Sequence, residues 1–299
     1  MTLTIMQKKW KWIGYVLYGL FLTTGLLYYR FPADTIRVYM ESSMARANPR
    51  ILVSLKGLRP GFPPGVDLEG ARISLKETPQ KPLLRAKKIA ITPDVWSFVS
   101  GISEYYFDAR AYQGDIKGRV RFDRHNVKAP FAASVLLKGI HVGRHPYLPP
   151  LVGRDVSGVL EGKIDYTGQR NRFIDGTGHG TLVISDGRVQ LLQPILGLDA
   201  LNFDRLSVKM ALKDRKVALT RLELEGPAVK GELSGTIFLK SNVSRSRLDL
   251  RGSMEPLGGL LGNIKADASA LRFLRQGLKG LNRSFVIQGT LENPEFKFI

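Results

Sequence analysis

Few residues in this chain have the chemistry of a catalytic or metal site. It has no cysteine, and its histidines are His125, His141, His145 and His179. His141 and His145 have the spacing that places two zinc ligands on one helix face, but Gly143 and Pro146 argue against a helix there and no glutamate intervenes. Without cysteine, thiolate metal sites, cysteine nucleophiles and disulfides are excluded. We therefore expect no bound metal and no cofactor.

Two other patterns have features of a chemical site. Residues 176–180 are a glycine-rich stretch, similar to a phosphate-binding loop. Such a loop opens a helix, whose N-terminal N–H groups meet the phosphate, whereas residues 181–185 predict a strand. Spacing isolates no carboxylate pair, and it does not isolate Asp155 with Ser157 as acid–base partners. We predict no catalytic, cofactor-binding or metal-binding residue and a protein that is not an enzyme.

Near the N-terminus, the chain contains a long apolar segment. Residues 10–29 are apolar apart from one lysine and two threonines. At ~1.5 Å per residue, a helix of about 20 residues crosses a ~30 Å hydrocarbon core. Three lysines among residues 8–11 predict a cytoplasmic N-terminus. A cleaved signal peptide and a buried helix are the alternatives, and the first lacks a small-residue cleavage site. We predict a cytoplasmic segment at 1–12 and a transmembrane anchor at 13–29.

The chain is strongly basic, with a formal net charge of +19. A basic surface attracts nucleic acid, anionic lipid headgroups or acidic proteins. The predicted anchor places most basic residues beyond the membrane, and they are scattered singly, as in Arg119, Arg121 and Arg124. We therefore expect a solvated or headgroup-facing surface and no nucleic-acid partner.

After a linker helix within residues 30–49, which Pro49 ends, the apolar period changes to two. Val229, Leu233 and Ile237 then alternate with polar residues, as in a sheet that covers one face. Crossover helices are missing, so parallel βαβ units are excluded. The strands predicted are 51–55, 66–75, 83–91, 105–111, 115–122, 131–140, 156–166, 178–185, 188–192, 203–212, 216–225, 229–239, 246–254, 284–290 and 296–299.

The predicted fold class is mainly β, with a single N-terminal transmembrane helix, a long, curved, mostly antiparallel sheet and a few short helices. The β-rich domain spans residues 50–299, with a subdivision near 145–155. Glycines within the strands favour strong curvature, giving an open groove or a sandwich. The apolar face must pack on a second sheet, a helix or lipid, and an amphipathic helix at 264–278 is one candidate cover.

Aromatic residues cluster in one part of the predicted sheet. They are Trp96, Phe98, Tyr105, Tyr106 and Phe107, and a short helical turn at 93–99 holds the first two. Core packing is the expectation for this cluster, and contact with a partner or lipid is the alternative.

Three stretches resemble a known family. Residues 222–239, 248–256 and 285–296 are similar to the C-terminal part of the type II secretion system protein N family. Residues 29–32 and 58–66 also fit that pattern. The resemblance implies a single-pass protein of the bacterial inner membrane with a β-rich periplasmic domain. Its expected role is to support assembly or partner interaction in the export of folded proteins, with other secretion-system subunits as partners.

A more distant resemblance is to the AsmA-like envelope proteins, which often end in a phrase similar to the Gly-Thr-Leu-Glu-Asn-Pro of residues 289–294. It implies a groove-like sheet whose apolar face binds or transfers lipid, with phospholipid as the partner. Neither family has catalytic residues to carry over, so both resemblances imply a binding protein.

Overall fold

A computed structural model of the chain describes residues 3–47, 51–61, 65–76, 78–123, 129–144, 156–169, 172–195, 198–257 and 283–299. Two predicted features, the subdivision near 145–155 and the covering helix at 264–278, lie outside these residues.

The helices come first in the chain and the strands follow. The helical elements are α1 (Leu3–Tyr29), α2 (Ala33–Ala47) and the 3₁₀ turns η1 (Val95–Ser100), η2 (Val142–Arg144) and η3 (Val243–Arg245). The strands are β1 (Ile51–Ser54), β2 (Gly57–Gly61), β3 (Gly65–Leu75), β4 (Thr78–Pro93), β5 (Ile102–Ala111), β6 (Gly114–Asp123), β7 (Phe131–His141), β8 (Val156–Gln169), β9 (Arg172–Ile195), β10 (Leu198–Lys213), β11 (Lys216–Glu225), β12 (Val229–Phe238), β13 (Arg247–Pro256), β14 (Arg283–Gly289) and β15 (Pro294–Phe298).

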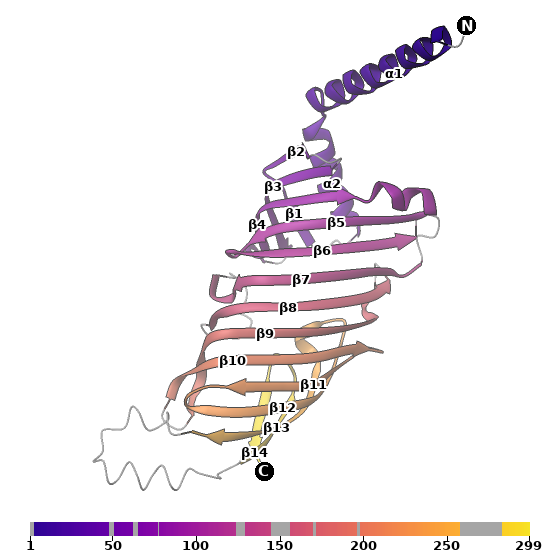
Figure 1. The fold of residues 1–299 in the computed structure, drawn as a ribbon. Coiled ribbons are helices and arrows are strands. Elements are labelled where there is room, and N and C mark those ends of the chain that lie inside the picture. The colour runs from indigo at the N-terminus through magenta and orange to yellow at the C-terminus, as the bar shows by residue number, and fades with distance from the viewer. Residues whose placement is uncertain are drawn as a thin grey trace.

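All described strands belong to one 15-stranded sheet, and every neighbouring pair is antiparallel. From β3 onward the strands follow one another in chain order, while β1 and β2 share the outer edge of β3. Figure 1 shows α1 projecting from the end of the sheet where α2 lies, and β14 running at a steep angle to β7 and β8. The predicted mainly β, antiparallel fold with a few short helices is confirmed.

The register explains why the strands alternate as they do. Directly paired residues lie on the same face of a sheet. One unbroken line of such pairs takes one residue from each strand between β2 and β15, and every member is apolar or glycine. This apolar row consists of Leu58, Leu68, Ile89, Ala109, Ile116, Leu137, Gly162, Leu182, Val208, Leu222, Leu233, Gly252, Phe285 and Phe298.

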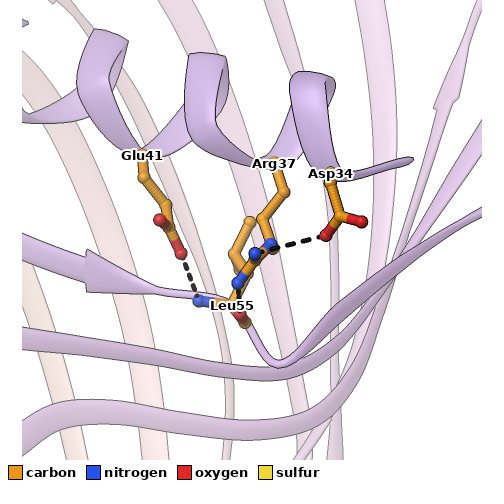
Figure 2. Close-up of polar contacts among 4 residues, drawn as sticks. All are labelled: Asp34, Arg37, Glu41 and Leu55. Atoms are coloured by element: carbon orange, nitrogen blue, oxygen red, sulfur yellow. Dashed lines mark hydrogen bonds and ion pairs between the residues drawn. The ribbon is translucent and has the colours of Figure 1, made fainter. Parts of the chain in front are cut away.

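Helix α2 closes the N-terminal end of the sheet. Leu55, between β1 and β2, has no strand partner, and α2 supplies its hydrogen bonds (Figure 2). The Leu55 N–H donates to Glu41 Oε1 at 2.8 Å, and Arg37 donates to the Leu55 carbonyl at 3.4 Å. Asp34 holds Arg37 through an ion pair of 3.2 Å. On its apolar side, α2 packs Met40 and its neighbours against Leu55, Leu58 and Leu68.

Glu41→Ala should destabilise this end of the sheet. The substitution leaves the Leu55 N–H, on a residue that is 3 % exposed, without its acceptor. A buried unsatisfied donor costs about 1–3 kcal/mol, and we expect a value near the lower end because Glu41 itself is partly exposed. Urea unfolding measures the loss. Glu41→Gln, which keeps a side-chain oxygen, should recover most of it, and equal stability of all three proteins would contradict the assigned hydrogen bond.

Three sequence-based expectations need correction. The strands predicted at 178–185 and 188–192 are one continuous strand, β9. The strand predicted at 115–122 begins one residue earlier, at Gly114, because the turn before β6 lies at Tyr112-Gln113, both with positive φ. The aromatic cluster is not a common core, because Trp96 is 84 % exposed and Tyr106 is also exposed. Trp96 follows an N-cap residue in a surface turn rather than a strand, so no sheet covers it.

The predicted anchor lies within α1. No helix in the described part of the chain combines the length and apolar character that crossing a bilayer requires. The transmembrane assignment of residues 13–29 is therefore not supported by the structure.

Candidate functional site

The first candidate site is the middle of the apolar row. Helix α2 covers its start, and its end is an aromatic cluster in which Phe296 stacks on Phe285 at 4.8 Å and meets Phe298 at 4.9 Å. Between these ends the row members from Ile116 to Val208 are only half-buried. In the described part of the chain, strands β6 to β10 contact their sheet neighbours and η2, and no second layer lies on them.

The accessible surface of the whole chain reflects this open construction together with the projecting helix α1. The chain exposes 20,781 Å², whereas a compact monomer of 33.3 kDa exposes about 12,600 Å². Contiguous apolar surface of this kind marks a binding surface in a soluble domain. The alternation of residues therefore builds a sheet with one apolar face available to a ligand.

The second candidate site lies on the opposite, polar face. Two adjoining hollows of about 470 and 590 Å³ share Arg119 and Ser134 in their linings. Register places the polar residues in rows of their own, such as Tyr106, Arg119, Ser134, Asp165 and His179 on β5 to β9. Small side chains on β7 and long basic ones on its neighbours produce the hollows, which we call the polar groove.

Ion pairs within the polar groove order its basic side chains. Asp165 accepts from Lys163 at 2.9 Å and lies 3.2 Å from His179 Nε2, and Glu104 lies 3.8 Å from Arg119. The carboxylates are shielded (Asp165 is 23 % and Glu104 15 % exposed), whereas the Arg119 and His179 side chains are 63 % and 76 % exposed. The acids therefore lie beneath the bases, and the groove presents positive charge to solvent.

Two pKa values respond to this arrangement. A hydrogen bond from Ser134, together with the Lys163 ion pair, lowers the pKa of the Asp165 carboxyl. The negative charge of Glu104 raises the pKa of the Tyr106 phenol, so this hydroxyl stays protonated at neutral pH and can donate a hydrogen bond.

Asp165→Asn should cause a pH-dependent loss of stability. Since the folded pKa of Asp165 lies below its ordinary value of 3.8, its ionised form stabilises the fold above that pH. The contribution disappears as the pH falls through the folded pKa. We expect a loss of less than about 1 kcal/mol at pH 7, because exposed ion pairs contribute little, and a smaller difference at pH 3. Thermal unfolding at both pH values measures it, and a larger difference at pH 3 would contradict the assignment.

The structure places only some of the residues weighed as chemical sites. The glycine-rich residues 176–180 lie inside β9, so the expectation of a strand rather than a phosphate loop is confirmed. His141 lies 3.2 Å from the Gly139 carbonyl, while His125, His145 and Asp155 fall outside the described residues. Among the residues that are described, His, Cys, Asp and Glu side chains form no group of three suited to a metal ion.

Sequence reasoning missed the polar groove. Its members come from β4 to β10, far apart in sequence, and only the strand register shows that they are neighbours. Alternating charges on each strand were the available signal, but they do not indicate which charges meet.

Fold and sites define a class of protein: a single-layer antiparallel sheet with one apolar and one basic face. In comparisons with known proteins, the chain matches no family model, no curated protein and no solved structure.

Proposed function

We propose that this chain is a non-enzymatic binding protein of the bacterial envelope that holds acyl chains on its apolar row. The observation that supports this function is the uncovered stretch of the row from Ile116 to Val208, bounded by α2 at one end and the aromatic cluster at the other. An acyl chain gains about 0.8 kcal/mol per buried CH₂ group, so a long chain lying across several strands binds favourably. The distant resemblance to AsmA-like proteins agrees with this ligand.

Native mass spectrometry of the full chain tests the acyl-chain hypothesis. The protein is extracted in mild detergent and transferred to a volatile buffer, and adducts with the masses of phospholipids are the expected result. Repeated preparations free of lipid, from cells with ordinary phospholipid content, would reject it.

Membrane attachment by α1 is part of this proposal. The helix is 27 residues long, and its described part exposes large apolar side chains, including Val16, Leu17, Phe21 and Leu26. Trp12 and Tyr29 lie at the two ends of the span predicted at 13–29, where aromatic residues suit the headgroup level of a bilayer. In this proposal the N-terminus is cytoplasmic and the sheet lies in the periplasm, so α1 crosses the inner membrane although no helix in the described part of the chain has the length and apolar character usual for a membrane span.

Alkaline carbonate extraction of membranes tests this attachment. The full chain should stay with the membrane, and a chain that starts after α1 should be released. A reporter fused to the C-terminus should be active only outside the cytoplasm, and activity inside would overturn the orientation.

The second candidate function is an accessory subunit of a type II secretion system, as the resemblance to protein N implies. One observation favours partner binding: β15 is an edge strand in which every residue is exposed. The Ile299 N–H donates to the Ser284 carbonyl, so by strand alternation the N–H groups of Phe296 and Phe298 point away from β14. An edge with free donors can accept a strand from another subunit.

Gene deletion tests the secretion role. Loss of the chain should reduce export of folded exoproteins. Reintroducing the gene should restore export only if the β15 edge is intact. Phe298→Pro removes an outward-pointing N–H and keeps the inward bonds to β14, and Phe298→Ala, which loses the same ring but keeps the N–H, is its matched control. Unchanged export after deletion would reject the secretion role and would leave the acyl-chain hypothesis to its own test.

A further inference from the structure

We infer that the polar groove is a binding site for an anionic saccharide, a chain of sugar rings bearing phosphate, sulfate or carboxylate groups. This site lies on the face opposite the apolar row, and it does not depend on the function proposed above.

Charge is the first argument. The two hollows are lined by five Lys or Arg side chains, Lys117, Arg119, Arg121, Lys163 and Lys213, against three carboxylates, so their net charge is +2. The carboxylates are Glu104, Asp108 and Asp165, and each already holds a basic partner. An anionic ligand therefore meets ordered cations whose side-chain entropy is partly lost before binding.

Two of the basic residues remain available to a ligand. Arg121 and Lys213 line the larger hollow, and neither has an acidic partner within 4.0 Å among the residues that the structure describes. They lie on β6 and β10, four strand spacings apart, a distance of about 19 Å across the sheet. The matching ligand is extended, with anionic groups near both ends, rather than a single phosphate.

The groove between these cations suits hydroxyl groups. Its floor is formed by Ala132, Ser134, Thr167 and Thr177, which are short and include three hydroxyl groups. At one end Tyr106 lines the smaller hollow and is 46 % exposed, so its ring can pack against the apolar side of a sugar while its hydroxyl stays polar. Mixed apolar and hydrogen-bonding contacts of this kind characterise ligand sites.

An acidic polypeptide is the main competitor and fits less well. A peptide main chain needs hydrogen-bond partners, and it usually finds them at a sheet edge. The groove lies over β4 to β10, in the interior of the sheet, where both neighbours of each strand occupy its backbone groups. Side chains alone face the ligand there, and they match hydroxyl and anionic groups.

Isothermal titration calorimetry of the full chain in detergent tests the inference. The probes are a sulfated tetrasaccharide, the same tetrasaccharide without sulfate, and tetraglutamate. We expect the sulfated probe to bind at least tenfold more tightly than the other two, with an affinity that falls as salt is raised. Failure of the sulfated probe to bind, or equal binding of tetraglutamate, would overturn the saccharide assignment.

Paired charge reversals locate the binding site. R121E/K213E should weaken binding of the sulfated tetrasaccharide at least tenfold. R72E/R85E makes the same change in net charge on the polar face outside both hollows, so we expect less than a threefold effect. Tyr106→Ala should weaken the sulfated and unsulfated probes by a similar factor, since it removes stacking rather than charge.

Circular dichroism first establishes that each variant is folded. If R121E/K213E does not fold, the single replacements Arg121→Gln and Lys213→Gln take its place, each with an expected loss of at least threefold. Equal losses in the groove and control variants would show that the probe responds only to overall charge, and this would reject the site.

Discussion

Phospholipid bound to the purified chain should be lost when Leu137 is replaced by glutamate and kept when Leu136 is replaced by glutamate. The two leucines are adjacent on β7 but point to opposite faces. Leu137 belongs to the apolar row between Ile116 and Gly162, while Leu136 pairs with Lys117 and Lys163 on the polar face. The two variants have the same substitution in the same strand, and they differ only in the face of the sheet that receives the glutamate.

The expected difference is large because a charge on the two faces has different surroundings. At position 137 an ionised carboxylate would have to share its site with an acyl chain, and an unpaired charge in such a contact costs several kcal/mol. At position 136 the carboxylate meets two lysines and water. We expect at least a tenfold drop in phospholipid per protein for Leu137→Glu and less than a twofold change for Leu136→Glu.

Lipid extraction followed by quantitative mass spectrometry gives the ratio of phospholipid to protein. Leu222→Glu, on the same row but in β11, is the second test, and it should reproduce the loss if the row acts as one surface. Thermal unfolding confirms that the variants compared are folded. Equal lipid content in Leu136→Glu and Leu137→Glu would mean that the apolar face is not the lipid site.

Much of this fold could be predicted from alternation alone. The stretch at 216–225 was predicted with the bounds of β11, and the alternation of Val229, Leu233 and Ile237 agrees with the face that pairing assigns to them. Alternation works here because one face is apolar in every strand, so a shift of one residue would place polar groups on that face. Missing crossover helices then leave only antiparallel connections.

The surfaces could not be predicted in the same way. Neither the apolar row nor the polar groove exists within one strand, since each depends on which residues of successive strands are paired. The β-bulges make this harder, because a register shift such as that between Leu137 and Ile140 changes the pairing without a distinct sequence signal. The hydrogen bonds from α2 to Leu55 were also missed, since they join a helix to an unpaired residue.

One strand glycine has a packing role that the sequence did not predict. Strand glycines predicted curvature, and the structure adds a local reason at Gly118, which lies opposite Phe107 and Val135. A Cβ atom there would collide with the Ser134 carbonyl oxygen and lie 2.6 Å from Phe107 Cζ. The missing side chain lets the Phe107 ring lie across β6, where it helps to form the apolar face. Glycine at this position is a packing requirement as well as a source of flexibility.

Gly118→Ala should therefore destabilise the sheet strongly. Either the pairing of β6 with β7 or the Phe107 ring must move, and overpacking of this kind costs about 1–3 kcal/mol. We expect the upper half of this range, because one of the colliding atoms belongs to the backbone of a central strand. Urea unfolding at neutral pH measures the loss, with the m-value as a check that the unfolding transition stays comparable.

Gly231→Ala on β12 is the matched control. The nearest atom to a Cβ at this position is the Ser253 carbonyl oxygen at 3.4 Å, an ordinary contact distance. Alanine in a strand interior is favoured over glycine by about 0.5–1 kcal/mol, so this variant should equal or exceed the parent in stability. The two substitutions are identical and both lie in central strands, so opposite signs would isolate the close approach at Gly118. If both variants lose the same stability, the space between Phe107 and the Ser134 carbonyl does not decide the residue at position 118, and curvature alone accounts for its glycine.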